Sequence, residues 1–449
     1  MMDWQLLLSK RRLSSTGALQ DVPAQNRRGV FERDWDRILF STAFRRMHDK
    51  TQVFPLPDND VVHSRLTHSL EVASVGRSLG KRVGEVVSQR HPALAAHIDI
   101  HDFGDIVAAG CLTHDIGNPP FGHAGENAIA SFFASELGRA ATRELAPRER
   151  DDFEHFEGNA QGFRVVTRLQ LEGYGGLHLT SATLAAFSKY PRESGRGLRR
   201  PGMVSTKKHG FFQADAAAFE ALAAETGLLA IAGEARMWAR HPLAFLVEAA
   251  DDICYSILDI EDGVRLRHVT ADEAEQLLSA LSIKISAAQL AACSDGIERV
   301  GYLRALAIGK LIEQCVEVFL AHEAAILAGT YGVSLADEIP DAPRLKALRD
   351  LAFRNCYRAP EVLEIELAGY EALGGLLATF VPAASAPEGS LGDKDKKTLA
   401  LLAGRGVKLA GSPYERVLRV TDYVSGMTDR HALATFRRLT GITIPGRLG

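Results

Sequence analysis

Residues 111–126 read CLTHDIGNPPFGHAGE. A mostly apolar segment ends in the dipeptide His114-Asp115 and passes directly into a loop rich in glycine and proline, which carries His123 and Glu126. Imidazole and carboxylate groups bind divalent metal ions and transfer protons, whereas an ordinary connection between two helices needs neither. The stretch therefore predicts a functional junction between two helices rather than a plain turn.

Helical periodicity extends from this stretch over most of the chain. We expect a helix over 106–116, with Asp105 as its N-cap and Gly117 directly after its end, and a second helix over 124–136. Further helices are predicted over 32–47, 65–87, 159–171, 180–187, 214–239, 242–262, 271–291, 301–328, 343–356, 360–380, 395–405 and 413–426. Strand signals are confined to two short pieces, around 51–55 and 203–206. The sequence therefore predicts a mostly α fold.

Three segments differ from the rest in composition. Residues 1–30 are polar and are expected to be irregular. The segments 189–210 and 381–396 are predicted to be long surface loops, and the first carries seven Lys or Arg residues and one Glu. There is no internal repeat and no convincing linker between domains.

Composition excludes several classes of protein. The 449 residues are 46% hydrophobic, enough for a large core, and the formal net charge of −4 gives no global signal for nucleic acid or acidic membranes. The five cysteines form no CxxC pair, which is typical of reduced thiols in a cytoplasmic protein. We see no signal peptide and no run of about 18 apolar residues, so we expect a cytoplasmic protein without a membrane span.

Four residues on predicted helices could hold a metal ion: His68, His114, Asp115 and Asp251. Their imidazoles and carboxylates suit magnesium or a first-row divalent cation held between helices. Taken singly, a histidine is more often a surface or core residue, and Asp251-Asp252 could be a solvated helix face. The pair nevertheless lies in a very apolar helix, where a buried carboxylate needs a partner. This burial favours a metal-ligand role for Asp251, whereas His68, His114 and Asp115 keep both interpretations open.

Longer stretches resemble one branch of the HD-domain phosphohydrolases, the deoxyguanosinetriphosphate triphosphohydrolase family. The order and spacing of His68, His114-Asp115 and Asp251 match that superfamily. The branch is indicated by 31-FERDWDRILFSTAFRRMHDKTQVF-54, 65-RLTHSLEV-72, 114-HDIGNPPFGHAGE-126, 155-HFEGNAQGFRV-165, 248-EAADDICYSILDIEDG-263 and 421-TDYVSGMTDRHAL-433. The resemblance covers most of the chain.

The resemblance implies a fold and a reaction. The fold would be an HD-domain helical bundle with a metal site between its helices, comprising a catalytic core over 1–270 and a C-terminal helical region over 271–449 packed on it. The reaction would split a deoxynucleoside triphosphate into deoxynucleoside and intact triphosphate, using a divalent ion such as Mg²⁺, Mn²⁺, Fe²⁺, Co²⁺ or Ni²⁺. Homo-oligomerisation, as a hexamer or tetramer, is implied by the same analogy.

The resemblance also implies roles for single residues. His68, His114, Asp115 and Asp251 would be the metal ligands. His123 and Glu126 would be the acid/base pair beside the metal, with the loop returning His123 toward it. Gln52, Tyr255 and Asp259 would meet the deoxyribose; Asp251, Tyr255 and Asp259 share one helical stripe. The alternative is that Tyr255 belongs to the core and Asp259 to an acidic cluster at the helix end.

Three cations would bind the phosphates. Arg65 lies one turn before His68, and Lys189 and Lys208 belong to segments that resemble phosphate-binding ones. The alternative is that the basic loop 189–210 is merely solvated, or that it binds an effector nucleotide or single-stranded nucleic acid. Alternatives for the whole protein are an HD-type enzyme acting on nucleoside monophosphates or cyclic nucleotides, and a catalytically idle binder of nucleotides or single-stranded nucleic acid.

Overall fold

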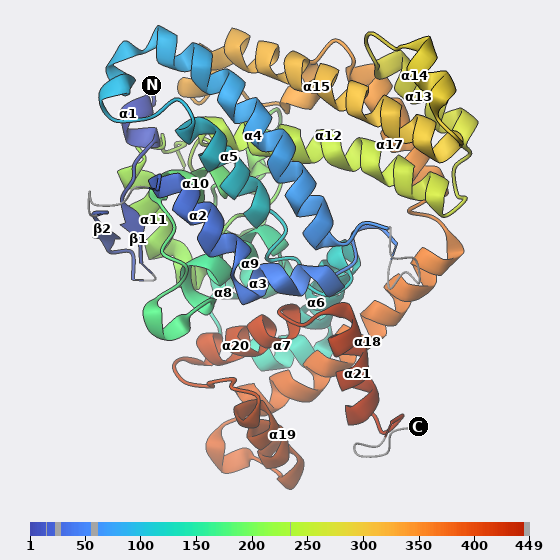
Figure 1. The fold of residues 1–449 in the computed structure, drawn as a ribbon. Coiled ribbons are helices and arrows are strands. Elements are labelled where there is room, and N and C mark those ends of the chain that lie inside the picture. The colour runs from blue at the N-terminus through green and yellow to red at the C-terminus, as the bar shows by residue number, and fades with distance from the viewer. Residues whose placement is uncertain (15, 23–27, 55–61, 234, 444–449) are drawn as a thin grey trace.

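The computed structural model describes residues 1–14, 16–22, 28–54, 62–233 and 235–443 (Figure 1). These form 21 α-helices, a two-stranded antiparallel ribbon and short 3₁₀ turns, confirming a mostly α fold. The first half contains α1 (Trp4–Leu7), β1 (Arg12–Leu13), β2 (Leu19–Gln20), α2 (Val30–Leu39), α3 (Thr42–Arg46), α4 (Arg65–Arg90), α5 (Asp102–Thr113), α6 (Gly122–Ala134), α7 (Glu136–Thr142), α8 (Pro147–Glu154), α9 (Gly158–Arg164), α10 (Ser181–Phe187) and α11 (Ala216–Glu225). The second half contains α12 (Pro242–Arg265), α13 (Ala271–Leu281), α14 (Ala287–Ala292), α15 (Gly296–Leu327), α16 (Leu335–Glu338), α17 (Ala342–Asn355), α18 (Pro360–Ser385), α19 (Asp393–Gly404), α20 (Pro413–Ser425) and α21 (Asp429–Leu439).

Three helices, α4, α5 and α12, pack against one another at the centre of the molecule. Local signals fix where they start. Ser64 caps α4 by accepting a hydrogen bond from the Thr67 amide, and α12 begins at Pro242 after His241, whose side chain accepts from the Leu243 amide. Because α12 is buried along most of its length, any carboxylate on its inner face needs a partner.

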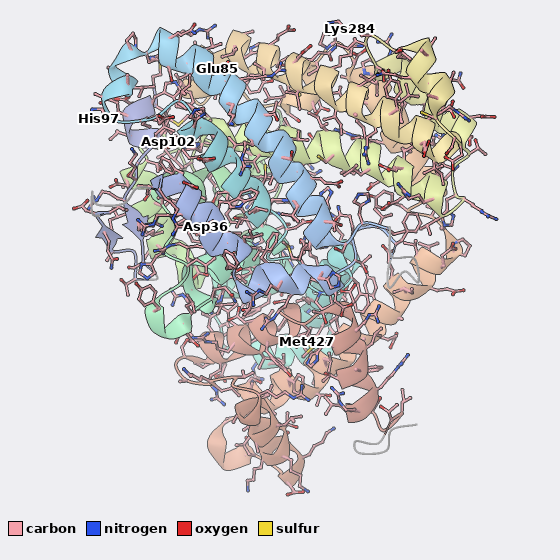
Figure 2. All side chains as sticks on the ribbon, viewed as in Figure 1. Asp36, Glu85, His97, Asp102, Lys284 and Met427 are labelled. Atoms are coloured by element: carbon pink, nitrogen blue, oxygen red, sulfur yellow. The ribbon has the colours of Figure 1, made fainter. Side chains whose placement is uncertain are left out.

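The C-terminal helices form the lower part of the molecule in Figure 1, where α18 packs against α6, α20 and α21. They share a hydrophobic cluster with α6 and α8, and it includes buried Met427 in the turn between α20 and α21 (Figure 2). By length and composition alone α18 could cross a membrane, but half of its most apolar window is buried in the fold. The division of the chain at residue 270 stays a prediction.

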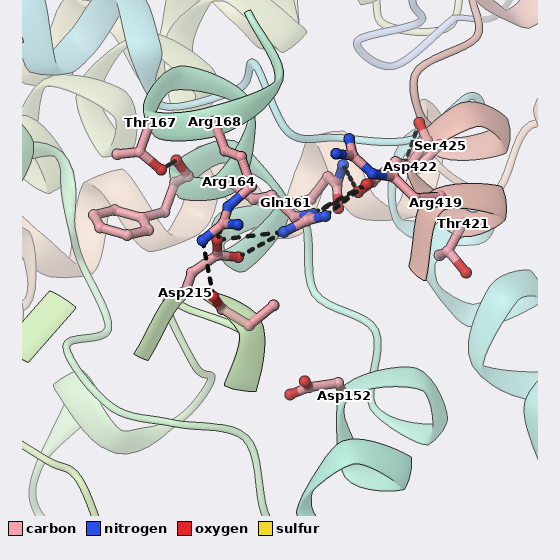
Figure 3. A network of polar contacts seen from close by, with 12 residues as sticks. Asp152, Gln161, Arg164, Thr167, Arg168, Asp215, Arg419, Thr421, Asp422 and Ser425 are labelled. Atoms are coloured by element: carbon pink, nitrogen blue, oxygen red, sulfur yellow. Dashed lines mark hydrogen bonds and ion pairs between the residues drawn. The ribbon is translucent and has the colours of Figure 1, made fainter. Parts of the chain in front are cut away.

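A buried ionic network joins α20, one of the C-terminal helices, to α9 (Figure 3). The Arg164 guanidinium on α9 donates to both carboxylate oxygens of Asp422 on α20, with Nε–Oδ1 at 2.8 Å and Nη2–Oδ2 at 2.9 Å. Its Nη1 lies 3.3 Å from Asp215, and Gln161 donates to Asp422 as well. Because these charges are buried but paired, the network fixes α20 against α9.

Several predicted boundaries are wrong. The helix expected over 214–239 ends at Glu225, because Gly227 has a φ of +67° and the chain then pairs Ala230 with Trp238 in a bridge. The helix expected over 271–291 is broken after Leu281 into α13 and α14. These losses follow from backbone geometry that apolar periodicity does not report.

The remaining differences are local. Residues 204–206 form a 3₁₀ turn instead of a strand, and in 51–55 only Thr51 pairs, in an isolated bridge; residue 55 lies outside the described residues. Helix α5 begins at Asp102, so Asp105 lies inside its first turn, and its end at Thr113 means that Gly117 is not its terminating residue. Part of 381–396 is helical, in α18 and α19. Helices α1, α7, α8, α16 and α21 were not predicted. The expectation that residues 1–30 are irregular is wrong where α1, β1 and β2 form.

Candidate active site

The four predicted metal ligands converge between α4, α5 and α12. One ligand atom each of His68, His114 and Asp115 lies within 4.8 Å of the others. The Asp251 Oδ1 atom lies 3.2 Å from Nε2 of His68 and 3.4 Å from Nε2 of His114. His68 lies on α4 and Asp251 on α12, whereas His114 and Asp115 lie in the turn directly after α5 rather than on the predicted helix. Two imidazoles and two carboxylates are a donor set that suits one divalent ion.

The hydrogen bonds of His114 favour metal binding. Its Nδ1 lies 2.6 Å from the Cys111 carbonyl oxygen and donates to it, which leaves the Nε2 lone pair facing the other ligands. That Nε2 is buried and has no hydrogen-bond partner among the described residues. A buried polar atom without a partner is costly, and a cation at this place would satisfy it. The residues present therefore fit a bound metal ion.

Each carboxylate of the cluster has a fixed cationic or amide partner. Arg65 Nη1 donates to Oδ2 of Asp115 at 2.7 Å, and the Asn118 amide donates to Oδ1 at 2.5 Å. Burial alone would raise the pKa of Asp115, but Arg65 and His114 outweigh it and hold the pKa below its usual range. Asp115 is therefore a carboxylate that is ionised and fixed in orientation.

Lys189 lies at the cluster rather than on the surface. Its Nζ donates to Oδ2 of Asp251 at 2.7 Å, and the residue is buried, as is Arg192. The expectation that 189–210 is a surface loop is therefore wrong for residues 189–194, of which only Tyr190 is not fully buried, and for the buried residues 205–206 and 209–210. Burial works to raise the pKa of Asp251, but Lys189 and His114 lower it well below the ordinary value.

The loop after Asp115 is shaped by contacts that the sequence did not reveal. Phe121 has a left-handed backbone with φ of +63°, and its amide donates to Oδ1 of Asp429 at 3.0 Å. The other Asp429 oxygen accepts from the amide and hydroxyl of Thr51. Lys50 donates to the carbonyl oxygens of Asn118 and Ser425. The C-terminal helices thus hold the loop in a conformation that is strained for a non-glycine residue.

His123 and Glu126, the residues predicted as an acid/base pair, are in contact. Nδ1 of His123 lies 2.7 Å from Oε2 of Glu126, and the Gly158 amide donates to Oε1 of the same carboxylate at 2.7 Å. Glu126 is buried, whereas the His123 side chain is 76% exposed. Burial opposes ionisation, but the hydrogen bond from His123 and the charge of Lys208 lower the pKa of Glu126 to about 2. Glu126 is therefore an anion that can orient the His123 ring.

Two glycines connect this pair with the metal cluster. A Cβ atom on Gly158 would lie 2.5 Å from Oδ1 of Asn118 and 2.7 Å from Oε1 of Glu126. A Cβ on Gly122, whose φ is +57°, would lie 2.5 Å from Nη2 of Arg65. Both positions therefore require glycine. Gly158 lets Asn118 approach closely and Gly122 lets Arg65 approach closely, and both of these side chains contact Asp115.

Lys208 bridges two carboxylates. Its Nζ lies 2.9 Å from Glu157 and 3.7 Å from Glu126. Burial and the nearby Glu126 charge raise the pKa of Glu157, while Lys208 opposes that change. Asn159 donates to Glu157 at 2.7 Å. The predicted cation therefore stands beside the acid/base pair.

Tyr255 and Asp259 follow Asp251 along the same side of α12. The Arg349 guanidinium lies over the Tyr255 ring, 5.4 Å from its centroid, and the ring is partly exposed. Asp259 is buried and accepts a hydrogen bond from the Tyr357 hydroxyl at 2.6 Å. Burial raises the pKa of Asp259 to about 7. Polar groups thus line the helix one and two turns from the cluster.

Gln52 was predicted to contact the sugar. It follows Thr51, which is tied to Asp429, and its Oε1 is buried without a hydrogen-bond partner among the described residues. A buried, unpartnered amide oxygen is available to a ligand donor.

Sequence reasoning missed Asn118, Lys50 and Asp429. Asn118 orients Asp115, while the other two hold the loop. Asp429 lies in the stretch 421–433, which carried part of the family resemblance but was given no role in the site. Its contacts span 308 and 378 residues, so no local pattern could identify them.

Together these groups can bind a phosphate ester. The cluster offers a cation site, Arg65 and Lys208 offer positive charge, and His123 offers a solvent-accessible proton carrier held by a carboxylate. This combination suits hydrolysis of a phosphate ester, in which charge develops at phosphorus and a proton must be delivered.

Comparison with known proteins agrees with this geometry. Residues 65–163 match the HD domain and residues 342–438 match the phosphohydrolase-associated domain. The deoxyguanosinetriphosphate triphosphohydrolase-like protein of Synechocystis sp. is 44% identical over 99% of this chain and its own full length. The like-named protein of Pseudomonas aeruginosa is 39% identical over the same shares. The deoxyguanosinetriphosphate triphosphohydrolase of Serratia proteamaculans is 32% identical over 91% of this chain and 93% of its own.

Relatives this similar over nearly the whole chain, together with the HD match over the segment that contains His68, His114 and Asp115, establish the family. This chain therefore belongs to the deoxyguanosinetriphosphate triphosphohydrolase-like family, and it is a metal-dependent phosphohydrolase of the HD type.

Proposed function

We propose that this protein hydrolyses deoxynucleoside triphosphates, dGTP among them, to a deoxynucleoside and inorganic triphosphate. The proposal rests mainly on α12. This helix contributes Asp251 to the metal-ligand cluster and carries Tyr255 and Asp259 one and two turns further along. A relative named for this activity, from Serratia proteamaculans, supports it.

His68, His114, Asp115 and Asp251 would hold the metal ion. When bound, the ion supplies Lewis-acid stabilisation of charge on an α-phosphate oxygen. The identity of the ion stays open among Mg²⁺, Mn²⁺, Fe²⁺, Co²⁺ and Ni²⁺, because the mixed nitrogen and oxygen donors accept all of them.

The residues of the chain supply binding and proton transfer. Arg65, held by Asp115, would bind the α-phosphate, and Lys189 and Lys208 would bind the phosphates beyond it. With Nδ1 held by Glu126, the Nε2 atom of His123 is the one that would pass a proton to the departing 5′ oxygen. The bond that breaks joins that oxygen to the α-phosphorus, and the phosphorus gains the oxygen of water.

The sugar would lie along α12. Gln52 and Asp259 would receive the 3′ hydroxyl, and the Tyr255 ring would pack where a 2′ hydroxyl would otherwise project. This arrangement accounts for selection of deoxyribose by steric exclusion.

Replacing Tyr255 by Ala should therefore weaken the exclusion of ribonucleotides. We expect the ratio of kcat/KM for dGTP to that for GTP to fall by about 10-fold or more, within the range for one pocket contact. Tyr255→Phe keeps the ring and should leave the ratio within about twofold. An unchanged ratio in Tyr255→Ala would mean that Tyr255 is a core residue.

The wider assignments remain proposals. We infer a cytoplasmic homo-oligomer, a hexamer or tetramer, with a catalytic core over 1–270 and a C-terminal helical region over 271–449. The alternative ligands for the basic loop 189–210 are a second deoxynucleotide, as effector, and single-stranded nucleic acid. Hydrolysis of nucleoside monophosphates or cyclic nucleotides is the alternative activity.

The product profile tests the proposed function. Purified protein is incubated with each dNTP, singly and in mixtures, and separately with nucleoside monophosphates and cyclic nucleotides. Mg²⁺ or Mn²⁺ is present, and the products are separated by anion exchange. Deoxynucleoside with intact triphosphate is the expected result. Turnover restricted to monophosphates or cyclic nucleotides would favour the alternative, and mixtures that alone support turnover would reveal an effector.

A further inference from the structure

A basic recess of about 370 Å³ lies beside the candidate active site. Two of its lining residues, Glu157 and Lys208, also belong to the group around Glu126. Five lining side chains are Lys or Arg and one is a carboxylate, so positive charge dominates. The cations are Lys208 together with Arg192, Arg196, Arg199 and Lys207.

Within the described residues Arg196 pairs with Glu154 at 2.6 Å and Lys208 pairs with Glu157 at 2.9 Å, whereas the other three cations have no ion pair. Arg192 is 6% exposed, yet its guanidinium donates only to the carbonyl oxygens of Thr206, at 3.1 Å, and Glu193, at 2.8 Å. Burial lowers the pKa of Arg192, the sign expected of a cation without sufficient compensation. Neither Arg199 nor Lys207 has an ion pair in the part of the chain that the structure describes.

His209 provides a second, independent observation. It lines the recess, is 3% exposed, and its Nε2 has no hydrogen-bond partner among the described residues. Burial, with the charge of Arg192, lowers the pKa of His209 to about 3, so the imidazole is neutral near pH 7. In the tautomer that carries its proton on Nε2, this imidazole has a buried donor that a ligand oxygen can satisfy.

We propose that this recess binds a polyphosphate chain, and that in turnover the chain is the triphosphate product leaving the metal site. The inference rests on the proposed function for the source of the ligand. Glu157 and Lys208 form the wall shared with the acid/base pair, so an anion released there meets the unpaired cations next. A chain of phosphates can contact several cations at once, as a single small anion cannot.

Binding of inorganic triphosphate to the full-length protein in EDTA, measured by calorimetry, tests the proposal. The recess variant is Arg199→Ala/Lys207→Ala, chosen because both side chains are exposed and the fold does not depend on them. The matched control is Lys394→Ala/Lys396→Ala, two exposed lysines on α19. Arg65 is present in all three proteins, so differences between them report the recess.

We expect the recess variant to bind triphosphate at least about 10-fold more weakly than wild type, and the control within about twofold. Affinity equal to that of the control would overturn the proposal. The chelator prevents turnover, so this binding experiment is independent of the product assay. Triphosphate can fail to bind the recess and still be the product, or it can bind the recess of a protein that does not release it as product.

Competing ligands distinguish the sources of the phosphate chain. If the product occupies the recess, dGTP and triphosphate should bind with similar affinity and an oligothymidylate should not displace triphosphate. Much tighter binding of dGTP, lost in the recess variant, would replace the product with a regulatory nucleotide and overturn that assignment. Displacement by the oligothymidylate would identify a nucleic-acid surface and overturn the polyphosphate site.

Discussion

Replacing His114 by Ala should abolish metal binding and, with it, turnover. His114 contributes the buried Nε2 that has no protein partner and lies 3.4 Å from Asp251, so its loss opens one side of the cluster. A Lewis acid supplies several kcal/mol of transition-state stabilisation, which corresponds to a loss of about 10³-fold or more in kcat. Metal content by elemental analysis and the rate of dNTP hydrolysis are measured on the same preparation.

His114 is the best ligand to remove because the variant leaves no buried charge unpaired. Asp115→Ala should also lose metal and activity, but it would strand Arg65, which is 7% exposed and donates to that carboxylate. His97→Ala, at an exposed histidine far from the cluster, is the control and should retain both metal and rate (Figure 2). A metal-replete and active His114→Ala protein would refute the ligand assignment.

Replacing His123 by Ala should also lower turnover but, unlike His114→Ala, should leave the metal bound. The side chain is 76% exposed and bonds to Glu126, not to a member of the metal cluster. Loss of a general acid or base lowers kcat by roughly 10²–10⁴-fold. Metal content, KM and kcat are measured together, and the expected change lies in kcat.

Glu126 should behave as a positioning residue. Glu126→Gln removes the anion that holds Nδ1 of His123, so kcat should fall less than in His123→Ala, and its dependence on pH should shift. Glu136→Gln, on the exposed start of α7, is the matched control. A His123→Ala enzyme with the wild-type rate would assign proton transfer to another group.

Periodicity predicted most helices because their apolar faces are continuous. Helix α12 is the clearest example, since Pro242 marks its start and its buried residues run almost to its end. Failures occurred where a single backbone conformation ended a helix. Gly227, with positive φ, stops the helix expected over 214–239, and no apolar spacing reveals that.

The site divides in the same way. His68, His114 and Asp251 could be identified because chemistry and spacing remain visible along the chain, and the structure brings them together. Asp429 could not, since its contacts with Phe121 and Thr51 depend on how α21 packs against the loop. The burial of Lys189 was missed because a basic, glycine-rich segment usually lies on the surface.

Hydrolysis of dGTP in ¹⁸O-water, with both products examined by mass spectrometry, tests the central claim most directly. Attack of water at the α-phosphorus with loss of the 5′ oxygen predicts one label in the triphosphate and none in the deoxyguanosine. Labelled deoxynucleoside monophosphate with unlabelled pyrophosphate would place the broken bond on the other side of the α-phosphorus. That result would contradict the triphosphohydrolase assignment while leaving the metal cluster in place.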